Sequence, residues 1–137
     1  MLRYSFLPSD YNPMVLLLGE AEDLRLLGGT LRHFAAEPRE ARFEELGFAT
    51  PDGGTTILLR PASDRAGMRR TGEGEALEWL LSPDQARAFA EQLYTLASPD
   101  SPAGSEMLGP DAANAREGIP VKASRGEFSD SFLVSER

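Results

Sequence analysis

The chain has 137 residues, of which 41% are hydrophobic and 26% charged, a composition typical of a globular domain and not of a disordered segment. Its formal net charge of −8 disfavours binding to nucleic acid or to an anionic membrane surface. The absence of cysteine excludes disulfides, thiolate nucleophiles and cysteine-ligated metal sites.

The beginning of the chain favours a cytoplasmic protein. Residues 1–8 alternate apolar and polar side chains and lack the apolar stretch of a signal peptide. The longest apolar run, 14–18, is far shorter than the roughly 20 residues that a membrane span needs. The single lysine, Lys122, among 14 basic residues is typical of a GC-rich bacterial genome.

Two strands are predicted first. Residues 2–6 alternate in polarity, which is the period of a half-buried strand. After a proline-containing turn at 8–13, residues 14–18 are apolar throughout, and this run predicts a strand that is buried on both faces.

A helix over 24–35 is predicted next, because its apolar residues recur at spacings of three and four and Pro38 ends the pattern. Acidic residues at 20, 22 and 23 suit the positive end of the helix dipole. Gly28 falls within the apolar stripe, where glycine costs about 1 kcal/mol relative to alanine. We therefore expect the backbone at Gly28 to pack closely against another element.

Four strands are predicted between this helix and a second one, at 42–46, 55–60, 68–70 and 75–81. Asp-Gly in the segment 51–54 predicts a hairpin turn between the first two of these strands. The second helix begins at Ser82, because Ser82-Pro-Asp-Gln85 forms a capping box with proline at the first helical position. Short strands at 105–108 and 119–123 follow the second helix.

The two halves of the chain repeat one plan. A shift of 62 residues lays 15–47 over 77–109 without a gap and brings both helical stripes into one register, with Gly28 opposite Ala90. We therefore predict an α+β domain, 1–137, built from two pseudo-repeats, about 1–62 and 63–125, with a C-terminal tail, 126–137. Duplicated strand–strand–helix–strand–strand units would form a largely antiparallel sheet with two helices on one face.

No catalytic, metal or cofactor site is predicted. His33 is the only histidine, and its helical position lies opposite the core residue Leu24. Without cysteine or a second histidine, the chain lacks the side chains that histidine-based triads and histidine-rich metal sites require. The clusters of acidic residues lack the spacing of a calcium loop.

Two groups of residues are candidates for binding. Arginine forks hold carboxylates and phosphates, so four arginines within eleven residues form a candidate anion site: Arg60, Arg65, Arg69 and Arg70. The tail is apolar enough to dock onto the protein body or onto a partner, which leaves a homodimer open; its candidate contact residues are Phe128, Phe132 and Leu133.

Two segments resemble small bacterial proteins grouped with toxin-immunity proteins: Val15-Leu-Leu-Leu-Gly-Glu-Ala-Glu-Asp-Leu24, which leads into a leucine-rich helix, and 121–132. Many such proteins have a histidine at the start of the strand after the helix, where this chain reads Gly104-Ser-Glu-Met-Leu108. The resemblance implies immunity-type inhibition as a function and assigns no residue to it.

Two functions are favoured from the sequence, and an enzyme that uses carboxylates alone is a third hypothesis, for which no pair of carboxylates is assigned. The first is a non-enzymatic protein-interaction module that recognises another macromolecule through its acidic surface or apolar tail, with inhibition of a basic toxin as one instance. The alternative is a regulatory domain that binds a small molecule or anion near the arginine-rich loop or between the two halves.

Overall fold

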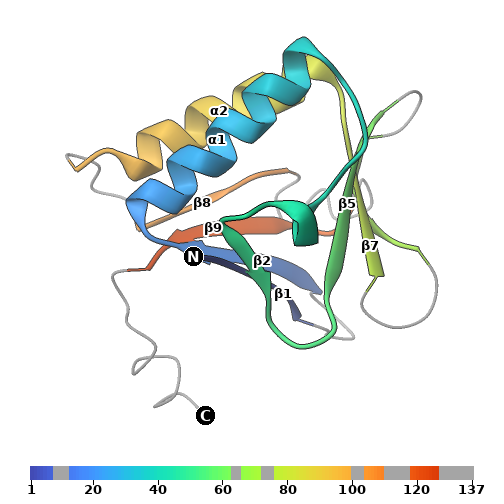
Figure 1. Ribbon diagram of the computed structural model, residues 1–137, viewed down its shortest axis with the longest axis horizontal. Helices are drawn as coiled ribbons and strands as arrows, with labels where there is room; N and C mark the ends of the chain where they lie inside the picture. The colour runs from blue at the N-terminus through green and yellow to red at the C-terminus, as the bar shows by residue number, and fades with distance from the viewer. Residues whose placement is uncertain (8–12, 63–65, 72–75, 100–103, 110–117, 127–137) are drawn as a thin grey trace.

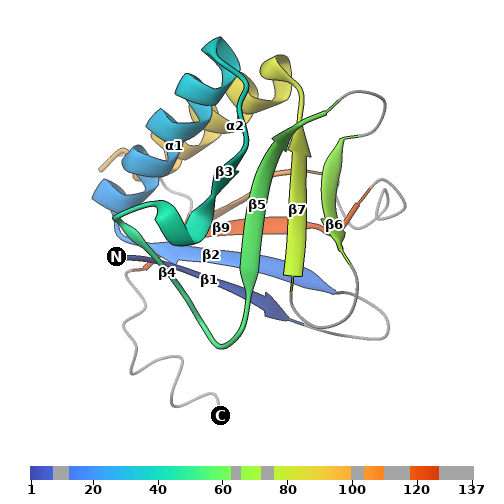
Figure 2. The same ribbon diagram turned by 45° about the vertical axis from the view of Figure 1, so that its right-hand side comes forward.

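The structure is a computed structural model that describes residues 1–7, 13–62, 66–71, 76–99, 104–109 and 118–126. It is an α+β fold with two mixed sheets and two helices, α1 (Ala21–Ala36) and α2 (Pro83–Ala97). Figures 1 and 2 show the helices side by side, running in opposite directions on the same side of one sheet, with the other sheet upright beside them. Neither helix is long and apolar enough to cross a membrane, as judged over the described residues.

Sheet A contains five strands in the order β4-β1-β2-β9-β8. Its central pair, β2 and β9, is parallel, whereas β1 and β8 are antiparallel to their neighbours β2 and β9, and β4 is parallel to β1. The bounds of these strands are β1 (Leu2–Leu7), β2 (Met14–Gly19), β4 (Ala49–Pro51), β8 (Ser105–Met107) and β9 (Val121–Arg125).

Sheet B contains four strands in the order β3-β5-β7-β6. Its central pair, β5 and β7, is also parallel, and the outer strands β3 and β6 are antiparallel to their neighbours. The bounds of these strands are β3 (Ala41–Arg42), β5 (Thr56–Pro61), β6 (Gly67–Arg70) and β7 (Ala76–Leu81).

The prediction of one largely antiparallel sheet is therefore wrong. The predicted turn at 51–54, where Gly53 has a positive φ of 71°, connects β4 in sheet A to β5 in sheet B. The predicted strand over 42–46 is a two-residue strand followed by a 3-10 turn, η1 (Phe43–Glu45). Alternation and turn residues identify local strands, but they do not show that β1 pairs with β4, that β2 pairs with β9, or that β5 pairs with β7 and not only with neighbours along the chain.

The strand at 14–19 also differs from the prediction. Val15 and Leu17 are buried, whereas Met14, Leu16 and Leu18 are only half-buried, so β2 alternates as a strand with one inner and one outer face does. The apolar run hides this alternation because its outward residues are apolar as well. β1 alternates as predicted, with Leu2, Tyr4 and Phe6 in the core.

Both helices begin at capping boxes. At α2, the Ser82 hydroxyl accepts from the Gln85 N–H at 3.2 Å and the Gln85 side chain accepts from the Ser82 N–H at 3.0 Å, which confirms the prediction. At α1, the Glu20 N–H donates to Asp23 Oδ2 at 3.0 Å, and the same carboxylate lies 3.1 Å from the Met1 ammonium.

Close packing at Gly28 is confirmed, and its neighbour is Tyr94 of α2. A Cβ built on Gly28 would lie 3.1 Å from Tyr94 Cε1, inside normal contact distance. Arg32 of α1 lies over the same ring, 5.8 Å from its centroid. The absence of a side chain at Gly28 thus lets the two helices approach each other.

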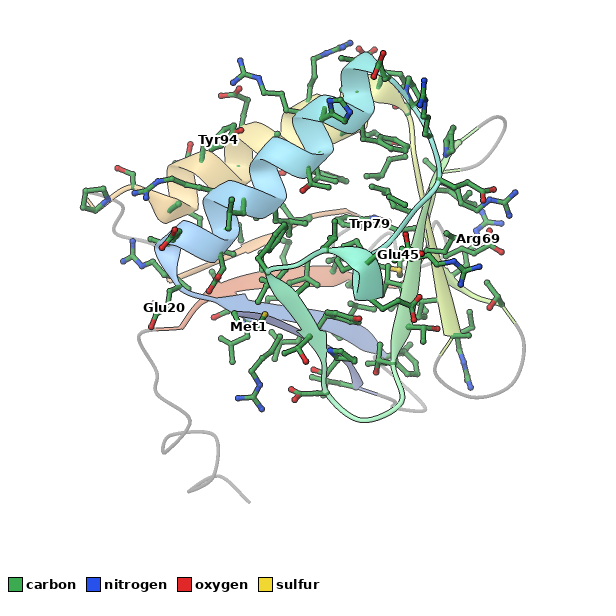
Figure 3. The ribbon with its side chains drawn as sticks, viewed as in Figure 1. Met1, Glu20, Glu45, Arg69, Trp79 and Tyr94 are labelled. Carbon is green, nitrogen blue, oxygen red and sulfur yellow. The ribbon has the colours of Figure 1, made fainter. Side chains whose placement is uncertain are left out.

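A chain of aromatic rings crosses the core from sheet A to α2. The Tyr4 and Phe43 ring centroids are 5.4 Å apart and nearly perpendicular, those of Phe43 and Trp79 are 6.3 Å apart, and those of Trp79 and Phe89 are 5.9 Å apart and stacked. Figure 3 shows Trp79 in the interior between the helices and sheet B. These rings connect β1, η1, β7 and α2, so both sheets share one core.

The Tyr4 hydroxyl in this chain is buried and has no hydrogen-bond partner among the described residues. Burial, with a smaller contribution from the Glu44 carboxylate, raises the pKa of Tyr4 above its usual value of 10.0. Tyr4→Phe removes an unsatisfied polar group, so we expect the free energy of unfolding at pH 7 to rise by about 1 kcal/mol in urea titrations.

The same variant has a second signature at alkaline pH. Because the pKa of Tyr4 is higher in the folded state, the wild-type protein loses stability as the pH rises past about 10, where tyrosine ionises in the unfolded chain. We expect the advantage of Tyr4→Phe to be constant below that pH and to grow above it. A constant difference up to pH 11 would contradict the raised pKa.

Two neighbouring glycines in α1 provide a matched pair of variants. A Cβ at Gly29 would meet only Tyr94 Oη at 3.8 Å, an ordinary contact, so Gly29→Ala should stabilise the protein by about 1 kcal/mol. Gly28→Ala gains the same helix propensity but displaces the Tyr94 ring, so its thermal midpoint should fall below that of Gly29→Ala. Equal midpoints would show that the close approach imposes no cost.

Candidate functional site

The two sheets each have a face turned away from the core, and on sheet A this outer face is largely apolar. The register places four outward residues side by side in its central row: Ser5, Leu16, Lys122 and Met107. We call the apolar residues of this side the outer aliphatic face and define it as Leu7, Met14, Leu16, Leu18 and Met107. Leu7 is 46% exposed, and the other four are half-buried.

Charges on this side of sheet A are few. Arg3 donates from Nε and Nη2 to Asp52 Oδ1 at 3.3 and 3.1 Å, so its charge is neutralised at the rim. Lys122 lies between Leu16 and Met107 in the central row, and no ion pair joins it to another described residue. The outer aliphatic face therefore contains one central cation among hydrocarbon side chains.

The outer face of sheet B has the opposite character. Its central row contains three charged side chains and one apolar one: Arg69, Glu78, Leu58 and Arg42. Arg60 lies between two carboxylates, with Nε 3.0 Å from Glu40 Oε1 and Nη1 3.1 Å from Glu78 Oε2. Paired charges of this kind are well solvated, so this face has the chemistry of an ordinary water-facing surface.

The structure separates the arginines of the candidate anion site. Arg60 and Arg69 lie on the same outer face of sheet B, with Glu78 next to both of them. Arg70 lies over the Phe6 ring, 5.4 Å from its centroid, on the other side of β6. Figure 3 shows Arg69 on the side of sheet B that faces away from the helices. Arg65 lies outside the described residues, and anion binding by this group stays a prediction.

The predicted contact residues of the tail, Phe128, Phe132 and Leu133, also lie outside the described residues. The point at which the chain enters the tail is described. The Gly126 N–H donates to the Gly19 carbonyl at the end of β2, with 2.6 Å between nitrogen and oxygen. A Cβ on Gly126 would lie 3.7 Å from Leu18 Cδ1, so the tail begins in contact with the outer aliphatic face.

Polar groups with catalytic or metal-binding chemistry do not converge in the described part of the chain. His33 is exposed at the end of α1, with Nε2 3.7 Å from Glu37 Oε2. The described residues contain no group of three or more His, Asp or Glu side chains placed to hold a metal ion. The outer aliphatic face is therefore the surface whose composition most needs an explanation, and sequence reasoning missed it.

The pairing of Arg60 with Glu78 is testable by a double-mutant cycle. Both side chains are partly exposed, so we expect Arg60→Met and Glu78→Gln to show a coupling of about 0.5 kcal/mol in urea unfolding, which falls as salt is added. The pair Arg42→Met and Glu78→Gln is the control. A coupling of zero for Arg60 and Glu78 would contradict an ion pair between these two side chains in solution.

No protein-family model, no curated protein and no solved structure matches this chain, so the candidate site rests on the geometry and chemistry of its own residues.

Proposed function

We propose that this protein is a non-enzymatic protein-interaction module whose docking surface is the outer aliphatic face of sheet A. The observation that supports the proposal is the outer aliphatic face itself, whose leucine and methionine side chains on β1, β2 and β8 lie on the side of sheet A away from the core and are at least partly exposed. Water contact of these side chains is unfavourable, and covering them with a partner removes that cost.

The charge distribution indicates how a partner would approach and bind. The net charge of −8 attracts a basic protein over a distance, whereas the contact itself would be apolar. Lys122 in the middle of the face favours a partner segment that places a carboxylate or carbonyl oxygen among its own apolar side chains. Immunity-type inhibition of a basic toxin is one instance that fits both requirements.

We also infer that the domain arose by duplication. The shift of 62 residues carries the bounds of β2 onto those of β7 and the start of α1 onto the start of α2. It also relates the sheet order β1-β2-β9-β8 to the order β6-β7-β5-β3. The register of the central strand pair differs by two residues between the sheets. Leu16 pairs with Lys122, so the shift of 62 would pair Glu78 with Arg60, but Glu78 pairs with Leu58.

On this inference, the two outer faces began alike and then diverged. Leu16 occupies the position in β2 that Glu78 occupies in β7, and Met107 stands at the end of the row where Arg42 stands in sheet B. At these two places sheet B has charged residues and sheet A has apolar ones. At the other two places of the row, Ser5 corresponds to Arg69 and Lys122 corresponds to Leu58. This difference supports a binding role for sheet A alone.

Site-specific photo-cross-linking tests the proposal. A photoreactive amino acid replaces Leu16 on sheet A or, as the matched control, Leu58 on sheet B, since both are half-buried outward leucines. In cells that naturally contain the protein, we expect one defined adduct from position 16 and none from position 58. Lys122→Glu should reduce the adduct. Equal labelling from both positions, or none from position 16, would refute this docking surface.

A further inference from the structure

We propose that residues 127–137 of the same chain dock onto the outer aliphatic face of sheet A when no partner is bound. This inference rests on the proposed function, in that it names an internal competitor for the same surface. It follows from the place where the chain leaves β9, from the composition of 127–137, and from the chemistry of the surface beside it.

The described part of the chain ends beside the outer aliphatic face. Gly126 is held by its hydrogen bond to the Gly19 carbonyl, so it stands beside the end of β2 and not away from the sheet. Its Cα carries no side chain at a place where a Cβ would be within 3.7 Å of Leu18. The next residues therefore start at the edge of the surface that they would cover.

The composition of 127–137 complements this surface. Four apolar residues, Phe128, Phe132, Leu133 and Val134, suit the exposed Leu7 and the half-buried leucine and methionine side chains of β2. Two carboxylates, on Glu127 and Asp130, stand between or beside the aromatic residues, and the face presents Lys122 without an ion pair to another described residue. Apolar groups of the segment would thus meet apolar groups of the face, and its carboxylates would lie near Lys122.

The length of the segment is sufficient. Eleven residues in extended form span up to about 36 Å, whereas neighbouring strands are only about 4.8 Å apart. Because the segment is tethered, it meets the face at an effective concentration of about millimolar, so a weak contact is enough to keep the face covered. The outer face of sheet B offers no comparable surface, since its central row is charged.

The test compares the full-length protein with the variant Phe128→Ser/Phe132→Ser by methyl NMR. In the wild type, we expect NOEs between phenylalanine rings and the methyl groups of Leu16, Leu18 or Met14. In the variant, these NOEs should be lost, and a soluble paramagnetic agent should relax the same methyl groups faster. The methyl groups of Leu58 and Leu80 on sheet B should not change.

Matched variants separate docking from general effects on the segment. Ser129→Ala/Ser131→Ala changes two residues of the same segment and should keep the NOEs, because no apolar contact is removed. Lys122→Glu should weaken them and Lys122→Arg should keep them. A free peptide of sequence 127–137, added to the phenylalanine variant at about millimolar concentration, should restore slow relaxation of the face.

Three results would overturn the proposal. The first is unchanged methyl relaxation in the phenylalanine variant, and the second is contact of the phenylalanine rings with sheet B. The third is protection that depends on protein concentration with a doubled mass by light scattering, which would assign the face to a second copy. Photo-cross-linking at position 16 is a separate readout: an absent adduct with intact NOEs defeats the proposed function, whereas a specific adduct without NOEs defeats the docking of 127–137.

Discussion

The parallel pairing at the centre of each sheet is the constraint on which the rest of the fold depends. β2 pairs with β9 in sheet A and β5 pairs with β7 in sheet B, so each sheet contains strands from both halves of the chain. A parallel pair needs a crossover connection: the one from β2 to β9 contains both α1 and α2, whereas β5 reaches β7 through β6. The two helices are thereby brought against each other, and the approach at Gly28 and the ring of Tyr94 completes their packing.

The aromatic rings and the alternation along the strands define one shared core and an outer face on each sheet. Tyr4, Phe43 and Trp79 are buried in the space that the two sheets share. The two outer faces differ in chemistry. The apolar face lies beside Gly126, the residue at which the described chain ends.

Local features of this fold could be predicted from the sequence, and distant pairings could not. The capping box at Ser82 and the close contact at Gly28 are encoded by neighbouring residues, and both were predicted. The pairing of β2 with β9 depends on the packing of the whole core, and no local sequence pattern predicts it. Arg69 and Arg70 were grouped by sequence distance, although the period of two in a strand already sends adjacent residues to opposite faces. The outer aliphatic face could not be predicted, because the apolar run 14–18 has the same sequence pattern whether one or both faces of the strand are buried.

The pairing of β2 with β9 also sets an order for folding during synthesis. The β1–β2 hairpin leaves the ribosome first, but its central neighbour, β9, is translated about a hundred residues later, at a pace of roughly 5–20 residues per second. For those seconds, the backbone edge of β2 and the inward side chains Val15 and Leu17 have no final partner. The nascent chain is thus exposed to aggregation through an unpaired strand edge, and sheet A closes only after residue 125 has been added.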